Sequence, residues 1–256
     1  MKKLAFLVLI ALAIVSCDQA KVSKNDNSDS QADQPIKLEA AKSEQDQQNE
    51  NEGIIVTRNQ SPGSPSMMTQ EDNERVKAAY ENAIQYYQQG QLQAAAEEFE
   101  TVLQFYPENP RALYYMGKIY YELNDYDLSL KYYEKALGNN INDSLSTLAI
   151  GMIYYQEKNM EKAMEYYNMA VDGFPNYGLA YYNRGTLYGQ LKRYDLSLAD
   201  LNKSIELDKT NPNAYLNRGL AFYYLKQMDN ACKDWSKAAD MGLAEGKKAV
   251  DIYCKK

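Results

Sequence analysis

This 256-residue chain contains no histidine and three cysteines. Acid–base catalysis would therefore have to rest on carboxylates or tyrosines. The commonest general base and the commonest zinc ligand are therefore both missing. The Asp and Glu residues stand mostly at exposed phases of the expected helices, where a solvated surface explains them, and no glycine-rich phosphate loop or nucleophile elbow occurs. The sequence predicts a protein that is not an enzyme, with no metal site and no cofactor.

Two arginines, Arg184 and Arg218, stand just before glycines and suggest either an anion site or a structural ion pair. Aspartates follow sixteen residues later at Asp200 and Asp234. In the two preceding segments of the chain, the same positions hold an apolar residue and a tyrosine: Met116 with Tyr132, and Ile150 with Tyr166. This internal co-variation favours a bidentate arginine–carboxylate pair between two helices.

The chain begins like a secretory signal, with Lys2-Lys3, an apolar run to Val15 and then Ser16-Cys17. The run is shorter than the roughly 20 apolar residues of a transmembrane helix. The four residues 14–17, Ile-Val-Ser-Cys, resemble the bacterial lipobox, in which a signal peptidase cuts before the cysteine and a diacylglycerol is attached to its sulfur. The alternative is an ordinary signal with a chance cysteine.

The lipobox resemblance implies a signal peptide over 1–16 and a lipidated Cys17 that holds the mature chain on a bilayer of the cell envelope. The outer membrane facing the periplasm is favoured, with the inner membrane and the cell surface kept as alternatives. Residues 18–66 are polar, contain no aromatic residue and have one brief apolar patch, Ile54-Ile55-Val56. Such a composition cannot offset chain entropy. We expect 17–67 to be a lipidated, disordered tether with a reach on the order of 40 Å.

Cys232 and Cys254 are the remaining cysteines. In an oxidising extracytoplasmic space they are a natural pair, and the alternative is two buried thiols. A loop of about 20 residues closed by this disulfide would contribute roughly 3 kcal/mol in the chain-entropy model.

The strongest pattern in the sequence is a period of 34 residues. Gly117, Gly151, Gly185 and Gly219 are spaced by this interval, and Ala83 occupies the same phase one period earlier. An aromatic residue stands three positions after each of them. A small residue follows twelve positions after each, and a bulky one sixteen positions after: Phe99, Tyr133, Tyr167, Leu201 and Trp235.

This order of small and large residues resembles the tetratricopeptide repeat, a 34-residue helix-turn-helix unit. The resemblance implies an all-α fold: a right-handed superhelical stack of five such units within 68–256, followed by a C-terminal cap helix over 243–254. The expected repeats are about 76–109, 110–143, 144–177, 178–211 and 212–245. Thr69, three residues before Asp72, marks the expected start of the first helix. The proline that usually closes the unit is replaced by Ile141, Lys209 and Leu243 in three copies.

The resemblance also implies a concave groove lined by the first helix of each unit. Relative to the repeat glycine, the inward phases give a wall rich in tyrosine. This wall comprises Tyr80, Tyr87, Tyr114, Tyr115, Lys118, Tyr121, Met152, Tyr155, Tyr182, Asn183, Asn217, Tyr223 and Tyr224. Tyrosine offers contact area with a polar tip, and an asparagine amide can bond to a peptide backbone. The alternative is that these tyrosines mainly pack between helices.

These features predict a non-catalytic scaffold that binds a peptide or a partner helix of envelope proteins in its groove. A glycan-binding module and a structural homo-oligomer are the competing readings. The net charge of −7 argues against a nucleic-acid partner.

Overall fold

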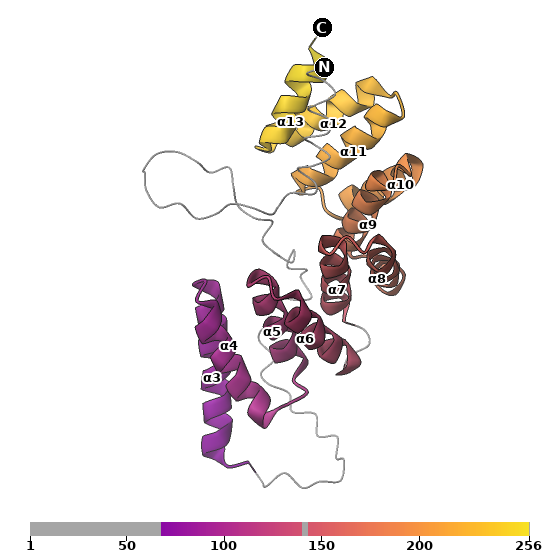
Figure 1. The fold of residues 1–256 in the computed structure, drawn as a ribbon. Helices are drawn as coiled ribbons and strands as arrows, with labels where there is room; N and C mark the ends of the chain where they lie inside the picture. The colour runs from indigo at the N-terminus through magenta and orange to yellow at the C-terminus, as the bar shows by residue number, and fades with distance from the viewer. Residues whose placement is uncertain (1–67, 140–142, 256) are drawn as a thin grey trace. The chain divides into compact units, whose positions relative to one another are not determined.

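The structure is a computed structural model that describes residues 68–139 and 143–255 (Figure 1). Within these residues the chain is helical, without a strand, and it forms two compact units, 68–169 and 170–255. Each unit is described by itself below. The predicted signal peptide, the lipidated Cys17 and the tether over 17–67 lie outside the described residues.

Helices follow one another in hairpins whose period matches that of the sequence. The helices that open a hairpin are α3 (Gln70–Gln88), α5 (Pro110–Glu122), α7 (Ser144–Gln156), α9 (Gly178–Gln190) and α11 (Pro212–Tyr224). Their partners are α4 (Leu92–Phe105), α6 (Tyr126–Asn139), α8 (Met160–Gly173), α10 (Tyr194–Leu207) and α12 (Met228–Asp240). From α5 onward, equivalent helices start 34 residues apart, so the prediction of an all-α repeat fold is confirmed.

Side-chain caps set where several helices begin. The Thr69 hydroxyl accepts a hydrogen bond from the Asp72 backbone N–H at 3.1 Å, and the Asp72 carboxylate accepts one from the Thr69 N–H at 2.9 Å. This reciprocal capping box satisfies two N–H groups of the first turn, and its bonds lower the pKa of Asp72. In α5 and α11 a proline at the first position follows a capping asparagine, Asn109 or Asn211.

The turn inside each hairpin has one geometry in all five repeats. A residue with positive φ stands at the same phase each time: Gly90, Asn124, Lys158, Lys192 and Lys226. The next N–H reaches back to a carbonyl five residues earlier, as in the 2.9 Å bond from Gln227 to Phe222. This is the Schellman arrangement that ends a helix. The three lysines adopt a left-handed conformation at a cost on the order of 1 kcal/mol each relative to glycine.

The core of each hairpin lies where the repeat glycine meets a large side chain. A Cβ built on Gly117 would lie 2.7 Å from Cδ1 of Tyr133, and one on Gly219 would lie 2.6 Å from Cδ1 of Trp235. Both large side chains are fully buried. Next to this contact the Ser129 hydroxyl donates to the Gly117 carbonyl at 2.7 Å, a bond that Ser197 repeats with Gly185. The glycines therefore allow two helices to approach closely enough to enclose one large ring.

The C-terminal end of the unit 170–255 is covered by a short helical segment. α13 (Ala244–Ala249) continues into the π-helix η1 (Val250–Cys254), and both pack against α12. In the described part of the chain, no helix combines the length and apolarity needed to cross a membrane.

We expect Gly117→Ala to destabilise the protein by about 1–3 kcal/mol, because the added methyl group overlaps the Tyr133 ring in a filled core. Gly138→Ala is the matched control on the partner helix α6, since a Cβ there meets nothing within 4 Å. The control should be neutral or stabilising by up to about 1 kcal/mol. Urea unfolding monitored by circular dichroism measures the stability of both variants. Equal effects would contradict the claim that the repeat glycine is required by the ring packed against it.

Candidate partner-binding face

Six of the predicted wall residues come together in the unit 68–169. Tyr80 and Tyr87 project from α3, and the other four project from α5; each is half-buried. We call this surface the tyrosine face, comprising Tyr80, Tyr87, Tyr114, Tyr115, Lys118 and Tyr121. The α4 helix, which packs on both α3 and α5, places Phe99 beneath it.

Four of the five rings of the tyrosine face, those of Tyr80, Tyr87, Tyr114 and Tyr115, are connected by ring contacts through Phe99 and one another. The Tyr115 ring stacks on Phe99 with centroids 5.2 Å apart, and it meets the rings of Tyr87 and Tyr114 edge-on at 5.6 and 5.7 Å. Tyr80 meets Phe99 edge-on at 5.7 Å from the other side. Offset and edge-on pairs are the favoured aromatic geometries. The layer is consequently ordered before any partner arrives, which lowers the entropy cost of binding.

Two charged side chains border this layer. The Lys118 ammonium lies 4.9 Å from the centroid of the Tyr87 ring, and the Tyr87 hydroxyl donates a hydrogen bond to the Glu122 carboxylate. Burial and this bond raise the pKa of Tyr87 well above its usual range, so its hydroxyl stays protonated. The face thus presents one cation, one anion and several neutral hydroxyls.

A further residue of this site was not assigned to it from the sequence. Tyr133 of α6 is fully buried, and its ring lies 5.6 Å from that of Tyr114. The sequence pattern identifies Tyr133 only as the bulky residue sixteen positions after Gly117. Met152 and Tyr155 of α7, both predicted for the wall, are half-buried in the same unit.

In the unit 170–255 the predicted wall residues are largely used by the fold itself. Asn217 is only 8 % exposed, and its amide donates to the Thr186 hydroxyl of α9 at 3.0 Å. Asn183 donates to the Leu179 carbonyl of its own helix at 3.0 Å. The expectation that two asparagine amides in register are open to a peptide backbone is therefore not supported for Asn217, because the neighbouring repeat takes up its amide.

The predicted tyrosines of this unit also have intramolecular partners. The Tyr253 ring of η1 lies 5.1 Å from Tyr223 and 5.5 Å from Trp235, so the C-terminal segment packs against Tyr223. Tyr224 stacks on Tyr194 at 4.6 Å, and Tyr182 packs against the buried cluster that contains Trp235. Tyr182 and Tyr223 are half-buried, as the tyrosines of the tyrosine face are, and Tyr224 is still 37 % exposed.

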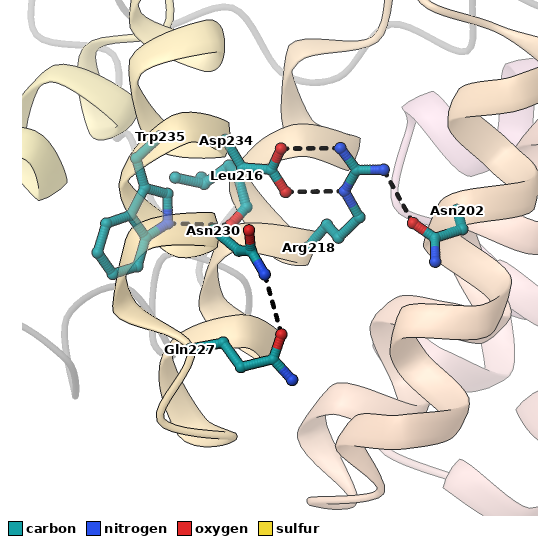
Figure 2. Close-up of polar contacts among 7 residues, drawn as sticks. All are labelled: Asn202, Leu216, Arg218, Gln227, Asn230, Asp234 and Trp235. Atoms are coloured by element: carbon teal, nitrogen blue, oxygen red, sulfur yellow. Dashed lines mark hydrogen bonds and ion pairs between the residues drawn. The ribbon is translucent and has the colours of Figure 1, made fainter.

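The arginine–aspartate pairs are confirmed. Figure 2 shows the Arg218 guanidinium bonded through two nitrogens to the Asp234 carboxylate, at 2.7 and 2.8 Å, while its third nitrogen donates to Asn202 at 2.8 Å. Arg184 and Asp200 form the same bidentate pair at 2.7 and 2.9 Å. The bond to Asp234 raises the pKa of Arg218. Because its donors point to protein acceptors, the pair is structural and the alternative of an anion site is not supported.

Cys232 of α12 and Cys254 of η1 are joined by a disulfide in the structure, with their Cα atoms 5.7 Å apart. The bond connects the C-terminal segment to the last repeat. Among the described residues, no group of histidine, cysteine or carboxylate side chains is arranged to hold a metal ion.

We expect Asp234→Ala to lower the free energy of unfolding by about 2–3 kcal/mol, because it leaves the guanidinium of Arg218 without its counter-ion. The side chains of this pair are 20 % and 9 % exposed, so solvent screens it only in part. The double variant Arg218→Met/Asp234→Leu should recover most of the loss, since apolar side chains of similar size replace both charges. Asp229→Ala on the exposed surface of the same helix is the control, with an expected change below about 1 kcal/mol. A double variant no more stable than Asp234→Ala would contradict this reading.

Comparison with known proteins agrees with the repeat geometry. Two family models, both described as tetratricopeptide repeat, match residues 80–144, 117–178 and 178–211, and these segments span slightly more than half of the chain. No curated protein matches the sequence significantly.

Solved structures with the same fold include MamA, YrrB and pilF. The MamA protein (41-end) from Desulfovibrio magneticus RS-1 is 18 % identical, with a TM-score of 0.58 over 66 % of this chain and 96 % of that one. YrrB, described as a TPR protein with an unusual peptide-binding site, is 19 % identical, with a TM-score of 0.55 over 71 % and 95 %. Pseudomonas aeruginosa pilF is 17 % identical, with a TM-score of 0.61 over 73 % and 95 %. At these identities the likeness establishes the fold.

Proposed function

Because this chain belongs to the tetratricopeptide repeat family, whose members often serve as protein-interaction scaffolds, we propose that it is a non-catalytic adaptor of the bacterial cell envelope. A lipid on Cys17 anchors it, with the outer membrane facing the periplasm as the favoured location. The folded repeats hold a peptide or a helix of an envelope protein. The lipobox-like residues Ile14 to Cys17 support the anchor, and the tyrosine face supports the binding role.

The tyrosine face is the observation that carries the binding role. Its tyrosines are half-buried, so part of each side chain is in contact with solvent, and the rings of Tyr87, Tyr114 and Tyr115 hold one another in place. Tyrosine of this kind is enriched in protein interfaces because it gives a large, rigid contact with a polar end. One structural neighbour, YrrB, is described as having a peptide-binding site. The same role is proposed for this chain on the strength of its own face.

The adaptor role predicts specific partners that depend on the tyrosine face. Chemical crosslinking in native envelopes, followed by purification of the lipidated chain and mass spectrometry, should identify a small set of proteins. Lys118→Ala/Tyr121→Ala removes two side chains of the face and should lose that set while remaining helical. The matched control Lys131→Ala/Lys135→Ala removes two exposed lysines of α6, the second helix of the same hairpin, and should retain it. An unchanged set in the face variant would place the binding surface elsewhere, and capture of cell-wall glycan alone would favour the glycan reading.

If Cys17 carries the lipid anchor, the association of the chain with membranes should depend on this cysteine. The wild-type chain should sediment with membranes and carry a diacylglycerol on the mature N-terminal cysteine, detectable as a mass increase of its first peptide. Cys17→Ala should lack the modification, because its side chain has no sulfur to acylate. Cys254→Ala serves as the control, since it removes a cysteine that the proposal does not acylate. A Cys17→Ala chain with unchanged lipid content would refute the anchor.

A further inference from the structure

The hydroxyl of Tyr133 lies in the protein interior without a hydrogen-bond partner. Among the buried side-chain oxygens and nitrogens of the described residues, it is the one without such a partner. The whole side chain is 0 % exposed. A buried hydroxyl with no partner lowers stability, so its presence calls for an explanation.

Packing does not supply that explanation, as the other repeats show. Phe99 fills the same repeat position in the first hairpin, is also 0 % exposed and has no hydroxyl. Trp235 fills it in the last hairpin, and there the polar group is satisfied, because the indole N–H donates to the Leu216 carbonyl at 3.2 Å (Figure 2). A phenyl ring is therefore sufficient to fill this position. The oxygen of Tyr133 is an addition that the hairpin itself does not use.

The Tyr133 side chain borders the tyrosine face, because its ring contacts that of Tyr114. Burial raises the pKa of Tyr133 well above its usual range, with smaller contributions from Tyr114, Tyr87, Tyr121 and Glu122. The hydroxyl is thus a permanent donor, and its ring contacts the Tyr114 ring of α5, with centroids 5.6 Å apart. Tyr114, whose ring contacts that of Tyr133, is half-buried, so the layer above Tyr133 is partly in contact with solvent.

The charges nearby decide what the hydroxyl can bind. The Glu122 carboxylate is one of the groups that act on it, and the Tyr87 hydroxyl already donates to that carboxylate. An anionic acceptor beside Glu122 would be repelled by that carboxylate, and the one cation of the face, Lys118, lies over the Tyr87 ring. A neutral carbonyl meets no such penalty, and a polypeptide in contact with the face offers one at every residue.

We propose that Tyr133 is a recognition residue of the tyrosine face, whose hydroxyl donates a hydrogen bond to a neutral carbonyl of a bound polypeptide once a covering tyrosine ring rotates aside. This inference rests on the proposed adaptor function and deepens it. The hydroxyl is unsatisfied in the free protein and satisfied in the complex, so the bond contributes to affinity without competition from an intramolecular partner. Tyr133 thereby makes binding depend on a polar contact as well as on aromatic area.

The test measures the effect of removing the Tyr133 hydroxyl on thermal stability and on peptide binding separately. Random 12-residue peptides displayed on phage are selected against the full chain in detergent, and the enriched peptides are synthesised with a fluorescent label. Their Kd is measured by anisotropy for the wild type, for Tyr133→Phe and for Tyr167→Phe. Tyr167 is the matched control because it occupies the same repeat position one period later, is 1 % exposed and packs against Gly151 as Tyr133 does against Gly117.

Tyr133→Phe should leave the thermal midpoint unchanged or raise it, because it removes only an unpartnered oxygen. The same variant should weaken peptide binding by about fivefold to tenfold, the effect of one hydrogen bond. Tyr167→Phe should leave the peptide Kd unchanged. A lower midpoint for Tyr133→Phe would show that the hydroxyl has an intramolecular role, and an unchanged Kd would show that the partner does not use it; either result overturns the inference and leaves the adaptor function standing. If no peptide is enriched on the wild type, or if only muropeptide glycans bind, the polypeptide partner itself is refuted.

Discussion

The close approach of two helices at a glycine is the contact on which the rest of the structure depends. At Gly117, Gly151 and Gly219 there is no room for a Cβ, because a large ring from the partner helix lies less than 3 Å from where it would be. The ring in turn is fully buried only because the helices approach so closely. This mutual requirement fixes the register of each hairpin. It also fixes which side of the first helix faces its partner and which side remains for the neighbouring repeat or for a ligand.

A second space between the helices of a hairpin is filled in two chemically different ways. In the second and third repeats, tyrosines stack: Tyr120 on Tyr132 at 5.5 Å, and Tyr154 on Tyr166 at 5.6 Å. In the fourth and fifth, the arginine–aspartate pair spans it, with Arg218 also 5.6 Å from the ring of Tyr215. Stacked rings gain from burial alone, whereas the ion pair must repay the desolvation of two charges with well-aligned bonds. In the fifth repeat the arginine also donates a hydrogen bond to Asn202 of the preceding helix, α10, a directional contact that stacked tyrosines do not provide.

Much of this fold follows from the sequence because its information is local and periodic. The helix starts, the closely packed glycines and the arginine–aspartate pairs depend on residues within one 34-residue unit, where spacing determines contact. The candidate site is different, since helical phase shows which way a side chain points but not what covers it. Asn217 points as predicted and is nevertheless bonded to Thr186 of the preceding repeat, and Tyr223 is packed against Tyr253, a residue thirty positions later. The left-handed lysines Lys192 and Lys226 were also not foreseen, because lysine carries no signal for positive φ.

The two units therefore differ in what their first helices offer to a partner. In 170–255 the Asn217 amide is bonded to the neighbouring helix and Tyr223 packs against the disulfide-linked C-terminal segment, while Tyr224 stacks on Tyr194 and is 37 % exposed. In 68–169 rings of the tyrosine face contact one another, and the one buried side-chain oxygen or nitrogen of the described residues without a hydrogen-bond partner, the hydroxyl of Tyr133, belongs to a ring that contacts Tyr114. Places where a sequence departs from its own packing rules are where function is expected, because selection for stability alone would remove the departure. A phenylalanine at position 133 would fill the hairpin as Phe99 does, so the oxygen of Tyr133 is a group that packing does not require and a bound partner can use.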